Sequence, residues 1–196
     1  MIIKPNGLCV RRCHDCDISL RRKNIVNGFG SNDKGGLIFI AEAPGHKEDV
    51  YGLPLIGRAG ELFNAYLYDV GLTRDHVYTT NTVKCLPRHG RAPFPHEIKN
   101  CLPLLRSELR ILKPTIVILL GSIAAQTYFQ NPNLWVKEIR NIPMMIKGRV
   151  VLSIFHPSYI LRNNDDERLK EEYHKNFRNV ARLYQLLVDP TFVLKY

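Results

Sequence analysis

Four short apolar runs, separated by longer amphipathic segments, constrain the fold of this chain more than any other feature. The runs are rich in Ile, Val, Leu and Tyr and lack strict alternation with polar residues, which is typical of strands buried on both faces. They occupy residues 37–41, 77–80, 115–120 and 150–155. Helical patterns lie between and after them, at about residues 58–70, 95–112, 122–129 and 165–187.

This alternation predicts an α/β fold, because strands that alternate with helices form a parallel sheet with right-handed crossovers and helices on both faces. The 196 residues are enough for one such domain with a sizeable core, and a second domain is not expected. Only residues 1–35 depart from the pattern. We expect them to form an irregular segment attached to the single domain.

The net charge of +10 favours a polyanionic partner, with a nucleic acid as the leading candidate. A basic surface with no such partner explains the charge equally well. No segment approaches the ~18 apolar residues of a membrane span, and residues 1–16 lack the apolar core of a signal peptide. We therefore expect an intracellular protein that does not associate with membranes.

Polar residues follow the predicted strands at the points where these end. Glu42 follows the first strand, Asn81 the second, the pair Gly121-Ser122 the third and His156 the fourth. The carboxyl ends of parallel strands lie along one edge of the sheet, where such folds bind ligands. Singly, Glu42 is explained as a loop carboxylate, Asn81 as a turn former and His156 as a core histidine. Together they predict a binding site.

The loop at residues 41–60 has the composition of a turn that forms such a site. The first strand breaks at a Pro-Gly pair, the acidic residues Glu48 and Asp49 follow, and a helix is predicted to start near Arg58. A strand that runs into a glycine-rich acidic loop and then a helix is a common way for open α/β sheets to build sites. We therefore expect this loop to form one wall of the site.

The chain has five cysteines, which in a reducing environment are more often metal ligands or core residues than disulfides. Cys13 and Cys16 form a chelating Cys-x2-Cys pair, and Cys85 and Cys101 are widely spaced. Two thiolates from each region predict one metal site that ties the N-terminal segment to the domain. The wide spacing favours an iron–sulfur cluster over zinc; simple burial of Cys85 and Cys101 is the alternative. Cys9 is a spare thiol or a substitute for Cys13.

These motifs together resemble those of the family-four uracil-DNA glycosylases, a thermophilic and bacterial group. The resemblance extends from Cys13 to about Arg162. It rests on EAPG-x2-ED-x2-G-x-P at 42–54, GRAG at 57–60, NTVKC at 81–85, R-x-P-x-P-x-E at 91–97, Cys101 and HPSY at 156–159. It implies a three-layer α/β/α sandwich with a central four-stranded parallel sheet, and removal of uracil from DNA in base excision repair. It also implies a structural 4Fe-4S cluster held by Cys13, Cys16, Cys85 and Cys101.

The resemblance also implies roles for residues of the predicted site. Asn81 matches the asparagine that reads uracil, which differs from cytosine at N3–H and O4. His156 matches the histidine that donates a hydrogen bond to uracil O2 as a neutral group and stabilises the departing anion. We assign Glu42 to positioning water or substrate. We assign Glu48 to shaping the pocket, with a contact that excludes the methyl group of thymine.

At two positions of the predicted pocket, this chain lacks a side chain that other uracil glycosylases use. Ala43 occupies the position where the better-known enzymes have a water-activating aspartate, as is usual for family four, so no general base is obvious. Leu55 replaces the phenylalanine that stacks on uracil in the family. Stacking contributes roughly 1–3 kcal/mol per base, so we expect weaker uracil binding with the aliphatic side chain.

Residues around the predicted pocket are expected to contact DNA, because base flipping costs free energy that phosphate contacts offset. We expect Ser158 to hold a phosphate beside the lesion and Arg162 to lie near another. Ile160 or Leu161 would fill the gap left by the flipped base; alternatively, these two residues begin a packed helix. Arg58 faces either DNA or solvent.

Other functions stay open at this point. A glycosylase of the same superfamily with broadened base specificity would act on hypoxanthine or mismatched thymine. A non-catalytic module would bind DNA lesions without excising a base, although binding alone needs neither Asn81 nor His156. A zinc-bearing nucleotide-binding protein is a more distant alternative. The leading interpretation is a monomeric enzyme that acts on uracil-containing DNA.

Overall fold

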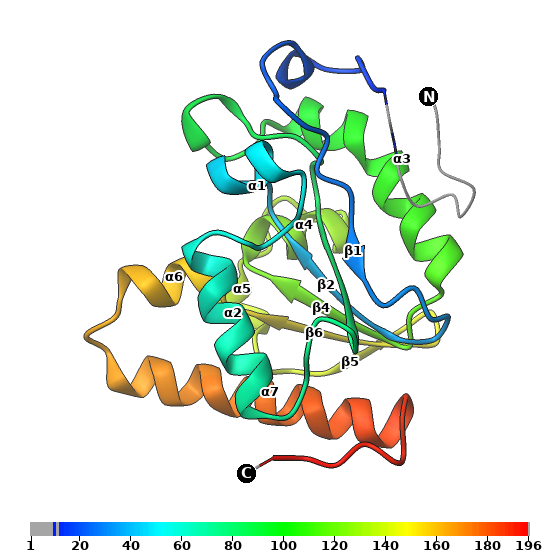
Figure 1. The fold of residues 1–196 in the computed structure, drawn as a ribbon, viewed down its shortest axis with the longest axis vertical. Coiled ribbons are helices and arrows are strands. Elements are labelled where there is room, and N and C mark those ends of the chain that lie inside the picture. The colour runs from blue at the N-terminus through cyan, green and yellow to red at the C-terminus, as the bar shows by residue number, and fades with distance from the viewer. Residues whose placement is uncertain (1–9, 11, 196) are drawn as a thin grey trace.

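The computed structural model describes residues 10 and 12–195 and folds them into three layers around a central sheet (Figure 1). The sheet has six strands in the order β1-β3-β2-β4-β6-β5. Their bounds are Phe29–Gly30 for β1, Leu37–Ala41 for β2, Val77–Asn81 for β3, Ile116–Leu120 for β4, Met144–Ile146 for β5 and Arg149–Ile154 for β6. The inner strands β3, β2, β4 and β6 are parallel, which confirms the predicted fold with its four-stranded parallel sheet.

Helices cover both faces of the sheet (Figure 1). They are α1 (His46–Tyr51), α2 (Arg58–Asp69), α3 (Pro95–Leu112), α4 (Ser122–Phe129), α5 (Val136–Ile139), α6 (Pro157–Arg162) and α7 (Glu167–Leu187), with short 3-10 turns at Asp17–Leu20 and Arg88–Gly90. The four helices predicted from the sequence are α2, α3, α4 and α7. The three others are too short to show a clear helical period.

Alternate residues of the inner strands face opposite helix layers. On one face, Leu37, Phe39 and Ala41 of β2 belong to a buried cluster with side chains from α2 and α7. On the other face, Ile38 and Ile40 belong to a second cluster with side chains from α3 and α4. All five are at most 2% exposed. Burial on both faces explains why the strand has a continuous apolar sequence.

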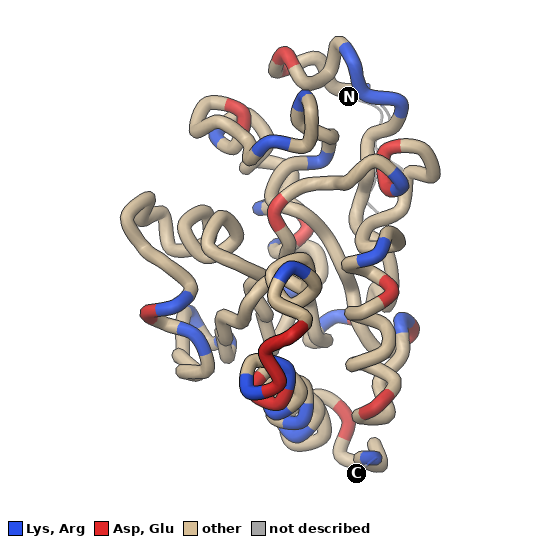
Figure 2. Tube along the Cα trace, turned by 90° about the vertical axis from the view of Figure 1, so that its left-hand side faces the viewer, with Lys and Arg blue, Asp and Glu red and all other residues tan. Residues whose placement is uncertain are grey.

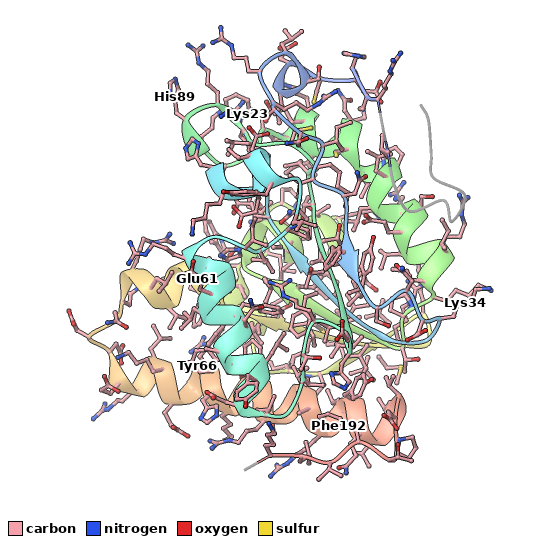
Figure 3. All side chains as sticks on the ribbon, in the orientation of Figure 1. Lys23, Lys34, Glu61, Tyr66, His89 and Phe192 are labelled. Carbon is pink, nitrogen blue, oxygen red and sulfur yellow. The ribbon has the colours of Figure 1, made fainter. Side chains whose placement is uncertain are left out.

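Aromatic rings form the centre of the first cluster. Phe39 of β2 meets Phe63 of α2 edge to face with centroids 4.9 Å apart, and Phe177 of α7 completes the group. Tyr66 of α2, labelled in Figure 3, packs on Tyr173 and Phe177 of α7. Truncation of a buried phenylalanine typically costs about 3–5 kcal/mol. These contacts fix α2 on the sheet and with it the loop that leads into α2.

The segment before β2 is irregular over most of its described length, but two features anchor it. β1 pairs with β3 in the antiparallel direction. Gly30 has φ +121°, and an added Cβ would lie 2.0 Å from the Val77 carbonyl oxygen. The backbone N–H groups of Lys23 and Asn24 donate to the Asp49 carboxylate at 3.0 and 3.3 Å, which holds the segment beside α1 (Figure 3). The sequence does not predict this ordering.

Lys and Arg residues are spread over many segments of the chain (Figure 2). In the first part of α7 they are interspersed with Glu167, Glu171 and Glu172, and Arg178 and Glu171 form an ion pair 2.5 Å apart. The net charge of +10 is therefore not concentrated on one segment. No helix in the described part of the chain is long and apolar enough to cross a membrane.

Candidate active site

The carboxyl ends of the parallel strands open into one cleft of about 1240 Å³. Glu42 follows β2, Asn81 ends β3, Gly121 follows β4 and His156 follows β6. All four line the cleft, so the fold brings together strand ends that are far apart in the sequence. The loop between β2 and α2 adds Ala43, Glu48, Leu55 and Arg58 to the lining.

Asn81 carries an unpaired polar group at this cleft. The residue is 1% exposed, and its side-chain Nδ2 has no hydrogen-bond partner among the described residues. A buried donor left unpaired costs about 1–3 kcal/mol, which an acceptor on a bound molecule would remove. The backbone of Asn81 is fixed, because its carbonyl oxygen accepts a hydrogen bond from Lys84 Nζ at 2.8 Å.

His156 is held as a neutral side chain. Its Nδ1 accepts a hydrogen bond from the backbone N–H of Ser158 at 3.1 Å, and Ser158 Oγ lies 2.8 Å from the same nitrogen. Burial, and then the charge of Arg162, lower the pKa of His156 to about 4, so the ring is uncharged near pH 7. Because Nδ1 accepts, the proton of the neutral ring is on Nε2. Nε2 is therefore the atom that can donate to a bound molecule.

The side chain of Glu42 is held by fewer contacts than that of Glu48, the other carboxylate of this wall. It is half-buried, and burial raises the pKa of its carboxyl group, while the charge of Arg162 acts in the opposite direction. Ala43 beside it contributes only a methyl group. Glu42 can therefore accept a hydrogen bond from water or substrate where Ala43 cannot.

Glu48 organises the loop between β2 and α2. Its Oε1 accepts hydrogen bonds from the N–H groups of Ile56 at 2.8 Å and Gly57 at 2.7 Å, and its Oε2 accepts from Gly45 at 3.1 Å. The residue is 7% exposed. One carboxylate thus holds the two ends of the loop together. Glu48 can shape the pocket through the backbone, while its contact with a thymine methyl group stays a prediction.

Leu55 lies beneath the cleft with a left-handed backbone, φ +53°, and is 5% exposed. Its carbonyl oxygen accepts a hydrogen bond from Arg74 Nη2, and Arg74 Nη1 also donates to Thr79 Oγ1 at 2.9 Å. Gly60 passes close to the same backbone, since an added Cβ would lie 1.8 Å from the Leu55 oxygen. Two independent contacts therefore hold the backbone from which the Leu55 side chain extends.

Of the predicted DNA contacts, three line the cleft, one is buried in the core and Leu161 does neither. Arg58, Ser158 and Arg162 line the cleft, and both arginines are exposed. Ile160 is 1% exposed and belongs to the hydrophobic core. The prediction that Ile160 is a wedge is therefore wrong, because its side chain packs from α6 into the core. Leu161, the other candidate, is half-buried on the same helix.

Three aromatic side chains at the cleft do not stand out in the sequence. Trp135 is 53% exposed, and the rings of Phe155 and Tyr159 stack with centroids 4.6 Å apart. All three line the cleft. Hydropathy does not distinguish an exposed ring from a buried one. Only Tyr159 carries a signal, because it belongs to the HPSY motif.

The sequence profile of the uracil DNA glycosylase superfamily matches residues 28–182 of this chain. The chain belongs to the uracil DNA glycosylase superfamily. The matched range contains every cleft residue described above. Cys13 and Cys16 lie before it.

The chain is also similar to named Type-4 uracil-DNA glycosylases. The protein of Archaeoglobus fulgidus is 35% identical over 185 residues, which cover 89% of this chain and 89% of that protein. The protein of Thermotoga maritima is 36% identical over 159 residues, covering 81% and 82% of the two chains. The protein of Saccharolobus solfataricus is 35% identical over 179 residues, covering 87% and 81%. These matches confirm the resemblance to family four.

In this member of the superfamily, the four cysteines predicted as ligands line one small cavity. Two N–H donors point at sulfur atoms there. The backbone N–H of Lys84 donates to Cys101 Sγ at 3.3 Å, and Arg22 Nη1 lies 3.8 Å from Cys85 Sγ. Hydrogen bonds to sulfur are a usual feature of iron–sulfur sites. Cys9 lies outside the described residues.

The four cysteines do not form a single-ion site among the described residues. No group of three His, Cys, Asp or Glu side chains in the described ranges is arranged to hold one metal ion, whereas zinc needs four ligands at about 2.0–2.3 Å. A multi-iron cluster takes one thiolate at each corner, so its ligand sulfurs lie further apart. Burial raises the pKa of Cys85 to about 12 and of Cys101 to about 11. A metal therefore has to displace protons there.

Proposed function

We propose that the protein excises uracil from DNA and leaves an abasic site, as the first step of base excision repair. The observation that carries the proposal is the buried, unpaired Nδ2 of Asn81 at the end of β3. Membership of the superfamily and the similarity to Type-4 uracil-DNA glycosylases support it.

Asn81 selects the base. Uracil, like thymine, presents an acceptor at O4, where cytosine presents an amino donor. The Nδ2 group of Asn81 donates to O4, and Oδ1 accepts from N3–H. Cytosine would face the Nδ2 donor with a second donor and leave both groups unpaired in a closed pocket. Sites built to hydrogen-bond one substrate reject such an analogue strongly.

His156 stabilises the leaving group. The bond between deoxyribose C1′ and uracil N1 breaks with its electron pair going to the base, so negative charge develops on uracil O2. His156 donates a hydrogen bond to this oxygen from Nε2, and the N–H of Ser158 holds the ring in the required tautomer. A donor that meets developing charge in this way contributes roughly 10²–10³ in rate.

A water molecule completes the reaction at C1′. Its oxygen adds to the sugar cation and its proton is lost to solvent or to a neighbouring base, which yields the abasic site. Glu42 positions this water. A sugar cation is reactive enough that weak activation suffices, which fits a site where Ala43 stands in place of an aspartate.

Residues at the cleft rim hold the DNA. Arg58 at the start of α2 and Arg162 at the end of α6 bind phosphates, and Ser158 contributes a hydroxyl group. Leu161 fills the gap left by the flipped base. Leu55 forms the aliphatic floor against uracil, and Glu48 keeps the loop of that floor in place.

The cysteines Cys13, Cys16, Cys85 and Cys101 hold a 4Fe-4S cluster. When bound, the cluster supplies a cross-link between the N-terminal segment, the end of β3 and α3, and it takes no part in the reaction. The protein acts inside the cell as a monomer with a single domain. A brown colour of the purified protein supports a cluster, whereas a colourless protein that contains zinc would exclude it.

The function is tested by incubation of the purified full-length protein with end-labelled oligonucleotides, followed by alkaline cleavage at abasic sites. The substrates carry one uracil, one hypoxanthine or one thymine opposite guanine. We expect cleavage at uracil. Equal cleavage at the other two bases would establish the broadened specificity that Leu55 leaves open, and binding without cleavage would establish a non-catalytic module. His156→Ala is the control variant, with DNA binding retained and most excision lost.

A further inference from the structure

A second cavity of about 660 Å³ lies at the opposite end of the sheet from the active-site cleft. Its walls come from the C-terminal half of α3, the end of α4 and the β5–β6 hairpin, with Thr115 and Arg149 where β4 and β6 begin. None of its lining residues lines the active-site cleft. The volume is that of a small-molecule pocket, which is typically about 300–1,000 Å³.

The charged side chains of this rear cavity are all basic. They are Arg106, Arg110, Lys113, Lys147 and Arg149. None of them forms an ion pair with a described residue. The C-terminal dipole of α3 accounts for the cations at its last turn and for Arg149, whose Nη2 donates to the Leu109 carbonyl oxygen at 3.2 Å, but not for Lys147 on the hairpin. Cations gathered without counter-charges repel one another, and a bound polyanion would relieve this repulsion.

The wall of the rear cavity also has an unsatisfied polar group. Thr127 of α4 is 8% exposed, and its Oγ1 has no hydrogen-bond partner among the described residues. A helical threonine commonly bonds to the carbonyl four residues before it, and no such bond is present here. Tyr128 follows it and contributes a half-buried aromatic ring to the same cavity. Leu109 and Ile146 extend this apolar wall.

We propose that the rear cavity binds a nucleoside triphosphate. The triphosphate lies among the five cations, the base packs against Tyr128 and the apolar wall, and the Thr127 hydroxyl bonds to the ligand. The cavity has the volume of a small-molecule pocket, which favours a mononucleotide over duplex DNA. The proposal concerns a site separate from the active-site cleft and does not rest on uracil excision.

Isothermal titration calorimetry of the full-length protein, without divalent cations, tests the proposal. The probes are ATP, inorganic tripolyphosphate and an undamaged DNA duplex. We expect ATP to bind saturably at one site. The double variant Arg106→Ala/Lys147→Ala should weaken ATP at least tenfold, whereas Arg182→Ala, which removes an exposed cation from α7, should leave it unchanged. Uracil excision should be unaffected in all these variants, which shows that they fold.

Tyr128→Leu distinguishes a nucleotide site from a simple anion site. We expect it to weaken ATP several-fold and to leave tripolyphosphate unchanged. The proposal is overturned if ATP does not bind, or if Arg182→Ala weakens it as much as the double variant does. It is also overturned if Tyr128→Leu has no effect on ATP. A third result would assign the surface to DNA instead. In that case ATP does not bind, the duplex binds saturably, and the double variant weakens duplex binding.

Discussion

Lys84 Nζ lies 2.7 Å from Glu108 Oε2 in the protein interior, where the two side chains are 2% and 4% exposed. Thr80 Oγ1 donates to the same carboxylate at 3.0 Å, and Lys84 Nζ also donates to the backbone oxygen of Asn81. The ion pair therefore connects α3 with the end of the strand that presents the candidate base-reading amide. Buried charges persist only with such partners.

Replacement of Glu108 by Gln should destabilise the protein by roughly 3–5 kcal/mol, because it leaves the Lys84 ammonium buried without its counter-charge. Urea unfolding measures the change in the free energy of unfolding. The matched control is Glu61→Gln, which removes the exposed partner of Lys47 and should change stability by about 0.5 kcal/mol or less. A similar loss of stability in the two variants would show that the buried ion pair contributes no more than the exposed one.

Replacement of Asn81 by Leu should reduce single-turnover uracil excision by roughly 10²–10³-fold, since it removes both hydrogen bonds to the base at nearly constant volume. Affinity for undamaged DNA should stay unchanged, because Asn81 is buried and is not one of the residues proposed to bind DNA phosphates. Fluorescence anisotropy with an undamaged duplex supplies this comparison. Excision within fivefold of wild type would rule out Asn81 as the residue that reads uracil.

His156 should make the protein less stable as the pH falls from about 6.5 towards 4. The pKa of His156 is lowered to about 4 in the fold, from an ordinary value of 6.5, so the unfolded state takes up this proton first. The free energy of unfolding should fall by at most about 1.4 kcal/mol per pH unit from this group. Below pH 4 the loss is complete, and above pH 6.5 it is absent.

The measurement for His156 is urea unfolding at pH 7, 6 and 5 for the wild type and His156→Gln. The glutamine variant should show a smaller decrease in stability over this range. The comparison uses the difference in pH slope, which is independent of any constant effect of the substitution. Parallel slopes would contradict a histidine that is held neutral.

Replacement of Leu55 by Phe should tighten inhibition by free uracil about tenfold, because ring stacking contributes roughly 1–3 kcal/mol. Steady-state inhibition of uracil excision gives the constant. Leu53→Phe on the same loop is the control, since Leu53 is 37% exposed and does not line the cleft. An unchanged constant for Leu55→Phe would show that this side chain does not contact the base.

The inner sheet and the long helices are predictable because their signals are local. A strand such as β2, buried on both faces, is a continuous apolar run, and a helix such as α3 repeats apolar residues at its own period. The edge strands β1 and β5 have two and three residues. Such short segments show no period, and their pairing depends on neighbours that the sequence does not specify.

The cleft was partly predictable for a topological reason. Once the strands are parallel, Glu42, Asn81 and His156 must lie at one edge of the sheet. The sequence does not reveal which side of the short helix α6 faces the core, and the wrong prediction for Ile160 follows from that. Nor does it reveal that Glu48 binds three backbone amides, because such contacts depend on the path of an irregular loop.

The close approach of Gly60 to the backbone of Leu55 separates a replaceable position from an irreplaceable one. At Gly60 any side chain would collide with the Leu55 carbonyl oxygen, so a randomised library should return glycine there almost without exception. At Leu55 the backbone path is set by that contact and by Arg74, so any side chain that tolerates the left-handed φ of +53° fits there. Natural drift or laboratory evolution can therefore exchange the floor of the cleft at a single codon while the architecture around it is inherited unchanged.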